Sequence, residues 1–399
     1  MAMILTKYGK TKEYDEPLFQ VPESTEEIFS VKAIDETGIF ELNKGQYSKT
    51  FILSDINFAG VTDMEQKSII INFSRVLNSM SCRFSYTVGN EYVDTNEFNN
   101  KILYKLRNDK KDELRNAYNH VIRDKLTDAK QGLYQTIYLT LTVSCDNMKE
   151  AVSTLASIEA ALRSAFIQIG VNGMAGSRLI PLSINQRMQI WYNFTHAGLN
   201  TDYKFDYERE FSAHHDWINI VVPGHIVFYN DYFVMNGCQY GRVMYISEYP
   251  KSLESDILSE LSSINCTSYI TVNDGDDHFF NTTILILYLA DTEEELQKIT
   301  DKISVIAGVK SLEAAPCFDK QREGINSAFI FGIQEFKRVC NFSAPNLEMF
   351  MPFKTQEIND ENGCYYGINQ LSQNAIFGNR KLLQSYNGLI LGKTGSGKR

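Results

Sequence analysis

Apolar and polar residues alternate along several segments of the chain, as they do in half-buried β-strands. The segment Glu36 to Phe58 alternates around Asn43-Lys44-Gly45, where the glycine can adopt the positive φ of a tight turn, so we expect a β-hairpin or meander there. The rest of the first hundred residues also predicts short strands and turns. Farther on, Trp217 to Ser247 predicts three strands separated by Pro223-Gly224 and Asn236-Gly237.

A helical period replaces this alternation between Asn100 and about Lys130, and it predicts an amphipathic helix. The apolar positions are Leu103, Leu106, Leu114, Tyr118, Val121, Ile122 and Leu126. Basic residues outnumber acidic ones between them, at Lys101, Lys105, Arg107, Lys110, Lys111, Arg115, Arg123, Lys125 and Lys130. The charged side is either a solvated helix face or a contact surface for acidic lipid headgroups, DNA or a partner.

A strand followed by a capped helix occurs twice. The strand Tyr134 to Ser144 leads to a helix start signal at Asp146-Asn147, and the strand Thr283 to Ala290 leads to a Thr292-x-x-Glu295 capping box. Both helices end near a glycine, at Gly170 and Gly308. The two copies share a pattern and little sequence, so we expect an α+β fold with two similar α+β units.

Composition narrows the class of protein. A chain of 399 residues with 43% hydrophobic content is long enough for two or three folded domains. Its net charge of −10 disfavours nucleic-acid binding by the molecule as a whole. The seven cysteines are scattered without a C-x-x-C pair, which favours a reducing cytosol. The apolar run Ile284 to Ala290 is too short to span a bilayer. We therefore expect a cytoplasmic protein.

Few residues suggest metal or hydrolytic chemistry. His214-His215 with His225 could in principle ligate a metal, but no carboxylate or Cys lies at suitable spacing. The acidic stretch Asn273 to His278 lacks the Glu that closes a calcium loop, so we interpret it as a solvated turn. No nucleophile elbow or zinc-protease motif is present in the sequence. We therefore predict no metal-ligating residues and no catalytic residue.

The segment Gly388 to Lys398 has a different character, because an apolar strand runs into a glycine-rich loop that matches the phosphate-binding pattern G-x-x-x-x-G-K. Glycines let consecutive backbone amides face one phosphate, and the lysine ammonium can reach the β- and γ-phosphates of ATP. The predicted nucleotide-binding residues are Gly392, Lys393, Thr394, Gly395, Ser396, Gly397 and Lys398. The expected ligands of this loop are ATP and Mg²⁺.

The chain resembles the large ATPases of conjugative type IV secretion systems, the TrbE/CagE/VirB group. The resemblance is close over Pro352 to Lys398, and it is looser over Trp217 to Pro250. It implies an N-terminal α+β docking domain, residues 1–340, followed at 341–399 by the opening hairpin, first strand and P-loop of an incomplete RecA-like α/β motor domain. In this family the motor hydrolyses ATP to power pilus assembly or the transfer of DNA or protein.

The same resemblance implies partners. The family docks on components of the secretion channel at the cytoplasmic face of the inner membrane, and the complete protein forms a homo-oligomer. Peripheral membrane association follows from such docking. Direct nucleic-acid binding is not indicated.

One residue departs from the family pattern. Arg399 stands where the family has the Ser or Thr whose hydroxyl binds Mg²⁺. The helix and the Walker B acid of the family lie beyond this position, so we expect that this polypeptide alone neither hydrolyses ATP nor binds it tightly. We also expect the strand Gly388 to Leu391 to be poorly packed. The alternative function is a non-enzymatic docking module of a secretion complex.

Overall fold

A computed structural model describes the chain over residues 3–5, 11–13, 24–43, 45–92, 103–128, 133–171, 176–199, 203–248, 257–273, 280–336, 340–342, 351–353, 358, 363–369, 375–382 and 387. The strands are β1 (Met3–Leu5), β2 (Thr11–Glu13), β3 (Val31–Ile34), β4 (Ile39–Leu42), β5 (Gln46–Leu53), β6 (Arg83–Tyr92), β7 (Leu133–Ser144), β8 (Leu179–Pro181), β9 (Ile226–Phe228), β10 (Phe233–Met235), β11 (Gln239–Glu248), β12 (Ser268–Asn273), β13 (Phe280–Ala290), β14 (Glu313–Pro316), β15 (Cys340–Phe342), β16 (Cys364–Ile368) and β17 (Ala375–Gly378). The helices are α1 (Asp63–Asn78), α3 (Asp112–Asp128), α4 (Met148–Ile167), α5 (Ile184–Thr195), α6 (Tyr207–Ser212), α7 (Trp217–Val221), α8 (Ile257–Leu261), α9 (Glu293–Val309) and α10 (Gln321–Ala328), with short 3-10 helices η1 (Thr25–Ile28), η2 (Phe58–Gly60) and η4 (Arg380–Leu382).

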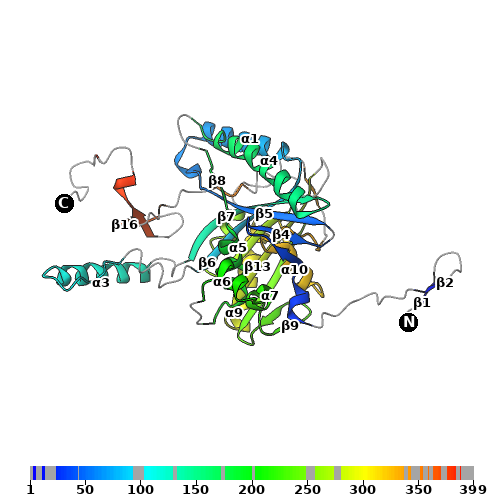
Figure 1. Cartoon of the computed structure of the whole chain (residues 1–399). Helices are drawn as coiled ribbons and strands as arrows, with labels where there is room; N and C mark the ends of the chain where they lie inside the picture. Colours follow the sequence, from blue (N-terminus) through cyan, green and yellow to red (C-terminus); the bar gives the residue numbers. More distant parts are fainter. Residues whose placement is uncertain are drawn as a thin grey trace.

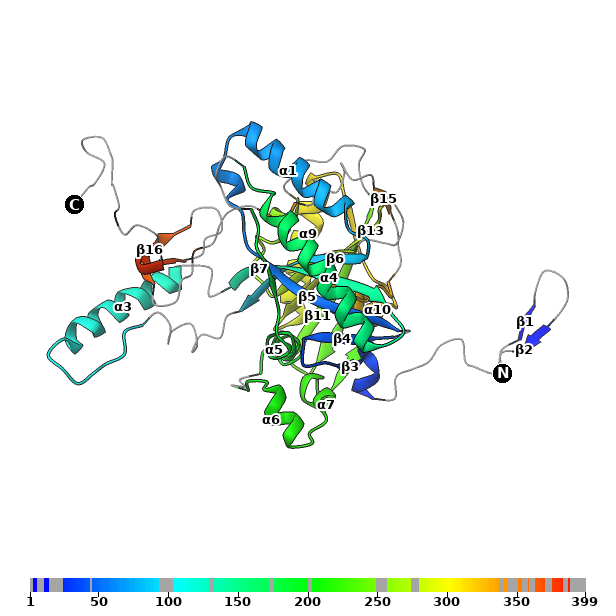
Figure 2. The ribbon, with the colours of Figure 1, turned by 45° about the horizontal axis from the view of Figure 1, so that its top comes forward.

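One large antiparallel sheet runs through the middle of the molecule, with helices on both of its faces (Figures 1 and 2). Its main path has the order β3-β4-β5-β7-β6-β12-β13-β11-β10-β9. β8 and β14 pair beside this path with β5 and β11, and β15 pairs with the start of β13. The structure therefore has the mixed α and β content that the sequence predicts.

Each half of the sheet is built as a β-α-β-β-α-β unit. In the first unit, which contains α1 and α4, the strand order is β8-β5-β7-β6. In the second unit, which contains α8 and α9, it is β14-β11-β13-β12. Both orders are those of the ferredoxin-like split βαβ motif. The units meet where β6 pairs with β12, with Tyr86 opposite Val272.

Both faces of the sheet are buried, which explains the continuous apolar run in β13. Ile284, Ile286 and Tyr288 belong to a core that α1, α4, α8 and α9 cover. The intervening Leu285 and Leu287 belong to a second core that α5, α7 and α10 cover on the opposite face. A strand that is covered on both faces is expected to be apolar at successive positions.

The last two residues of α10 and the extended segment that follows them cross the second face of the sheet; we call residues 327–332 the strap. Hydroxyl and amide groups of β5, β7 and β12 satisfy its backbone carbonyls. These bonds join Ser48 Oγ to Phe331 O (2.6 Å), Thr142 Oγ1 to Gly332 O (2.9 Å), Thr50 Oγ1 to Ile330 O (3.2 Å) and Asn273 Nδ2 to Ser327 O (2.8 Å). The strap therefore binds both units through polar side chains of their strands.

Arg187 on α5 fastens the strap to the sheet. Its guanidinium donates to the carbonyls of Ser48 (2.8 Å), Ile330 (3.2 Å) and Phe331 (3.3 Å), and it lies 3.6 Å from the centre of the Phe40 ring. Burial lowers the pKa of this guanidinium. The carbonyl oxygens and the ring face compensate part of the cost of burying the charge.

Three predicted elements differ from the structure. The first hundred residues contain the 16-residue helix α1, which begins at a capping box of Thr62 and Glu65 and buries Ile69 and Phe73. The helix predicted from Asn100 begins only at α3, because Asn108 has a φ of +55° and the Asp112 carboxylate accepts a hydrogen bond from Arg107 N. Trp217–Val221 forms the helix α7 rather than a strand, because Asp216 caps it.

The two helix start signals are confirmed, with one change. Asn147 Oδ1 accepts a hydrogen bond from Glu150 N at 3.0 Å, and Thr292 Oγ1 accepts one from Glu295 N at 3.2 Å. Glu295 Oε2, however, accepts from Asp291 N at 3.3 Å, one residue before the position that a capping box predicts.

The chain returns to the first unit after the second one ends. β15 pairs with β13, and the short segment 351–353 then packs against α1. The rings of Phe73 and Phe353 meet edge to face with centroids 5.6 Å apart. Met351 and Phe353 are buried in the core that α1 and α4 cover.

Candidate functional site

The predicted nucleotide-binding residues Gly392 to Lys398 lie outside the described residues, as does the strand Gly388 to Leu391 that precedes them. The hairpin expected before this strand is present as β16 and β17, which pair antiparallel. Its position therefore shows where the lead-in to the loop meets the rest of the molecule.

The hairpin packs against α3, which projects from the body of the molecule (Figures 1 and 2). We call residues 103–128 the arm; it lies in the connection between β6 and β7 of the first unit. Ile122 of the arm and Phe377 of the hairpin are both fully buried, with exposed fractions of 2% and 0%. Tyr118 and Tyr365 pack around them, and the Tyr118 hydroxyl makes a hydrogen bond with the backbone of Tyr365. The arm thus joins the first unit to the hairpin.

Polar groups within the arm hold its first residues against α3. The Asn119 amide forms two hydrogen bonds with the backbone of Tyr104, both 2.9 Å long. Arg115 NH1 lies 2.6 Å from Asp109 Oδ1 and also contacts the carboxylate of Asp112. Arg115, one of the basic residues of the predicted contact surface, therefore forms ion pairs within the arm.

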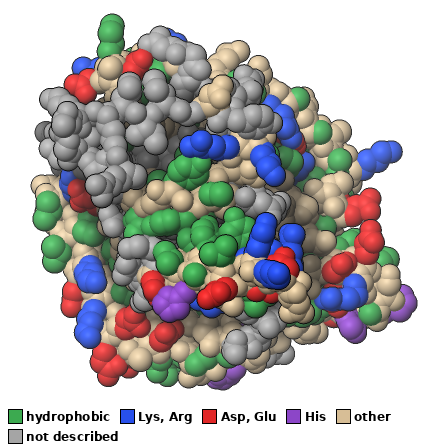
Figure 3. Space-filling view, turned by 90° about the vertical axis from the view of Figure 1, so that its left-hand side faces the viewer, with side chains coloured by type: hydrophobic (Ala, Val, Ile, Leu, Met, Phe, Trp, Pro, Cys, Tyr) green, Lys and Arg blue, Asp and Glu red, His purple; other side chains and the backbone are tan. Residues whose placement is uncertain are grey.

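The outer surface of the arm is mixed. Lys105, Arg107, Lys110 and Lys111 are exposed. Large apolar side chains are exposed beside them, at Tyr104 (51%), Leu106 (53%), Leu114 (71%) and Val121 (55%). Figure 3 views the molecule from the side toward which α3 points, and it shows hydrophobic side chains gathered near the middle of this face. Such a surface is suited to protein contact.

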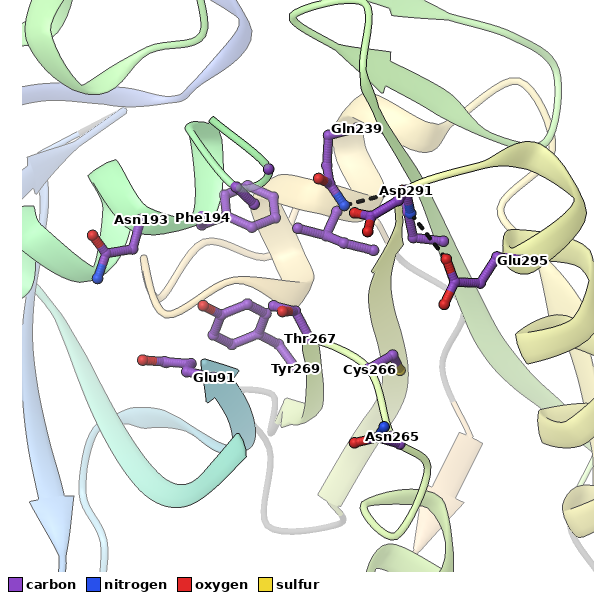
Figure 4. Close-up of a pocket in the computed structure, with 14 residues that line it drawn as sticks. Glu91, Asn193, Phe194, Gln239, Asn265, Cys266, Thr267, Tyr269, Asp291 and Glu295 are labelled. Carbon is purple, nitrogen blue, oxygen red and sulfur yellow. Dashed lines mark hydrogen bonds between the residues drawn. The ribbon is translucent and has the colours of Figure 1, made fainter. Parts of the chain in front are cut away.

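A pocket of about 380 Å³ opens where the two units meet, at the ends of β6 and β13 (Figure 4). Fourteen residues line it: Glu91, Asn193, Phe194, Ala197, Gly198, Gln239, Asn265, Cys266, Thr267, Tyr269, Leu289, Ala290, Asp291 and Glu295. They come from β6, α5, β11, β12, β13, α9 and the connections between these elements. The pocket therefore depends on both units and on the helix between them.

Glu91 is the most perturbed acid of this pocket. Its carboxylate accepts a hydrogen bond from the Tyr138 hydroxyl at 2.9 Å and another from the Tyr269 hydroxyl. Burial raises the pKa of Glu91 to about 7, although the two hydroxyl donors oppose this shift. Glu91 consequently changes its charge near neutral pH.

The histidines that the structure describes are not arranged as metal ligands. His215 Nδ1 lies 2.6 Å from Glu210 Oε2 on the surface around α6. The same carboxylate accepts bonds from Tyr203 (2.6 Å) and Arg209 (2.6 Å), and these donors lower the pKa of Glu210 to about 2. Within the described ranges, no three His, Cys, Asp or Glu side chains come together as metal ligands would. Six cysteines of that part of the chain are free thiols.

The comparisons with known proteins found no match, either among protein-family models or among curated proteins. None of the helices in the described part of the chain combines the length and the hydrophobicity needed to cross a bilayer.

The sequence did not reveal the pocket. Its lining comes from segments that are far apart in the chain, and Glu91 and Gln239 lie in strands whose alternation gives no sign of a cavity. Asp291 and Glu295 were recognised only as helix-start residues.

Proposed function

We propose that this chain belongs to the ATPases of conjugative type IV secretion systems, and that its two α+β units form the module that docks on the secretion channel. The loop Gly392 to Lys398 would hold the phosphates of ATP together with Mg²⁺. The complete protein would power the transfer of DNA or protein, or pilus assembly.

The observation that carries this proposal is the run Gly388 to Lys398 with its lead-in from Pro352. An apolar strand that enters a loop with Gly392, Gly397 and Lys398 at these spacings is the pattern of a phosphate-binding site. The filler residues Thr394 and Ser396 are small and polar, as a tight loop prefers.

The arm supports the proposal because it offers a mechanical link. Ile122 and Phe377 bury each other between the first unit and the hairpin that leads toward the loop. A displacement of the docking module would therefore reach the hairpin through packed side chains, and a displacement of the hairpin would reach the docking module in the same way.

The partners follow from the same proposal. The chain would bind channel components in the cytoplasm at the inner membrane, as a peripheral protein, and would assemble into a homo-oligomer. The exposed apolar and basic residues of the arm suit such contact, and Leu114 and Val121 are exposed aliphatic side chains of α3.

A capture experiment tests the docking role. The tagged chain is expressed in donor cells that carry a conjugative system, and the channel components that co-purify are identified by mass spectrometry. We expect the wild-type chain to capture them, and we expect the double variant Leu114→Asp, Val121→Asp to capture at least about fivefold less, because charge disrupts an apolar contact. Val305→Asp, on the exposed side of α9, is the matched control and should behave as wild type. Failure of the wild-type chain to capture any channel component would refute the docking role.

A second candidate function is a non-enzymatic docking module. Arg399 favours it, because an arginine at this position offers no hydroxyl to Mg²⁺. Capture of channel components without any nucleotide binding that depends on Lys398 would support this second function over the first.

A further inference from the structure

The pocket between the units has the wrong charge for a nucleotide. Glu91, Asp291 and Glu295 contribute three carboxyl groups, and no Lys, Arg or His occurs among the fourteen described residues that line the pocket. A phosphate or carboxylate ligand would meet only negative charge there, and each like-charge approach is unfavourable. The chemistry of the lining instead suits a ligand that carries positive charge and hydrogen-bond donors.

One buried group of this pocket has no partner. Gln239 is only 4% exposed, and its amide nitrogen donates to Ala290 O at 3.0 Å. Its Oε1 atom is buried and accepts no hydrogen bond. A buried acceptor without a donor costs about 1–3 kcal/mol, so the site gains when a ligand N–H reaches it.

Gly198 lies directly beside this atom, and its lack of a side chain leaves room for the amide oxygen. Gly198 has a φ of +74°, and a Cβ atom built on it would lie 2.5 Å from Gln239 Oε1. Any side chain at position 198 would therefore crowd the unpartnered oxygen. Figure 4 shows Gln239 and Asp291 on one side of the pocket and Tyr269 and Glu91 on the other.

We propose that this pocket binds an alkylguanidinium group, either as a free small molecule or as an arginine side chain. A guanidinium presents five N–H donors in one plane, which can serve Gln239 Oε1 and a carboxylate of Asp291 or Glu295 together. The cavity volume of about 380 Å³ fits a group of this size.

The charge and the shape of the ligand can be tested separately. The full chain is titrated with N-methylguanidinium, with the neutral isostere N-methylurea and with inorganic phosphate, and binding is followed by calorimetry. We expect the guanidinium to bind at least about tenfold more tightly than the urea, because charge-assisted hydrogen bonds are roughly twice as strong as neutral ones. Phosphate should not bind to the wild-type pocket. Equal affinity for guanidinium and urea, stronger binding of phosphate, or no binding of guanidinium would each overturn the proposal.

Matched variants test whether the guanidinium binds in this pocket. Glu295→Gln removes a carboxylate from the lining and should weaken guanidinium binding about tenfold. Glu294→Gln removes the same charge from the same helix turn outside the lining and should change the affinity less than about twofold. Gly198→Ala should abolish binding by filling the space before Gln239 Oε1. If that variant is unstable, Gln239→Met, which removes the acceptor without adding charge, gives the same test.

Two further ligands distinguish an arginine side chain of a partner from a free small molecule. Free arginine and a blocked Gly-Arg-Gly peptide carry the same guanidinium, and they differ in the charges around it. Preference for the peptide indicates a partner side chain, and preference for the free molecule indicates a metabolite. If neither competes with N-methylguanidinium, the proposal is refuted.

Discussion

The two β-α-β-β-α-β units share one strand order, yet the same face of each is built from different chemistry. In the first unit the cross-strand pairs of β5 and β7 on the strap side are Ser48 with Thr142 and Thr50 with Thr140. In the second unit the corresponding pairs of β11 and β13 are Val243 with Leu287 and Tyr245 with Leu285. Thr142 and Leu287 each lie five residues before the N-cap of the following helix, at Asn147 and Thr292.

The segment that packs on this face of each unit explains why the first unit is polar there and the second is apolar. The strap presents bare carbonyl oxygens to β5 and β7, and buried carbonyls need donors, so hydroxyl side chains are favoured there. The helix α10 instead covers β11 and β13 with Ile325, whose backbone carbonyl accepts the hydrogen bond from the Phe329 N–H at the end of the helix. The fold therefore fixes where a residue points, and the neighbour above the sheet decides whether that residue is polar.

The largest loss of stability is expected when a buried leucine of the second unit is replaced by the threonine that the first unit has at the corresponding position. Leu287→Thr should lower the free energy of unfolding by about 4 kcal/mol, because it removes a fully buried side chain and adds a hydroxyl that has no carbonyl above it. The reverse change, Thr142→Val, should cost about 1.5 kcal/mol, since it leaves Gly332 O without its donor and keeps the volume. Denaturant unfolding of both variants measures the two values. Equal costs would show that the covering segment does not decide the chemistry.

The next effect is a change of stability with pH, and it concerns Glu91 in the pocket where the two units meet. An unperturbed glutamate titrates near 4.5, and burial raises the pKa of Glu91 to about 7 in the folded state. Between these values the folded chain retains a proton that the unfolded chain has lost. The contribution of Glu91 to stability is therefore fully present below about pH 4.5, and it falls by about 3 kcal/mol as the pH rises through 7.

Glu91→Gln is the matched variant, because an amide keeps the shape and cannot titrate. The difference in unfolding free energy between the variant and the wild type should shift in favour of the variant across a series from about pH 5 to pH 8. If the difference in unfolding free energy stays constant over this range, Glu91 is solvated and the pocket where the units meet is open to water.

A further effect concerns the backbone of the strap. Gly332 has a φ of +83°, and a Cβ atom there would lie 2.5 Å from Thr142 Oγ1 and 2.9 Å from Thr140 Cγ2. Gly332→Ala should therefore cost about 2.5 kcal/mol from crowding and left-handed backbone together. Gly237→Ala is the control, because Gly237 also has a positive φ, +69°, with nothing within 4 Å of the added atom. That control should cost about 1 kcal/mol. Similar costs at both sites would show that the strap does not press on the sheet.

The sequence predicts the repeated strand and helix, but it does not predict which segment packs on the sheet of each unit. Asn147 and Thr292 indicate helix starts through local hydrogen bonds. The alternation in β7 and the apolar run in β13 indicate strands, because all of these signals depend on neighbours in sequence. Ser48 in β5 and Thr142 in β7 occupy polar positions of their strands, and the local sequence does not show that they are buried. Their burial depends on the strap, whose Gly332 lies 190 residues farther along the chain than Thr142.

Other differences have the same origin. The apolar residues of Trp217–Val221 suit a strand locally, but Asp216 caps a helix whose Ile218 and Val221 are buried against α5 and its neighbours. The pocket gathers Glu91, Gln239 and Asp291 from three distant segments, and no local pattern connects them. The phosphate-binding loop stays a prediction from its motif, because its residues lie outside the described part of the chain.

The proposed secretion ATPase is tested most directly by photolabelling with a nucleotide in the assembled complex, because irradiation also traps a nucleotide that binds weakly. Channel complexes captured with the tagged chain are irradiated with 8-azido-ATP, and labelling is compared for the wild type, Lys398→Ala and Lys393→Ala. The account predicts that all three chains capture channel components, that Lys398→Ala loses at least about tenfold of the labelling, and that Lys393→Ala, in the same loop, keeps most of it. Labelling that is absent from the wild type, or that is unchanged in Lys398→Ala, would contradict the account.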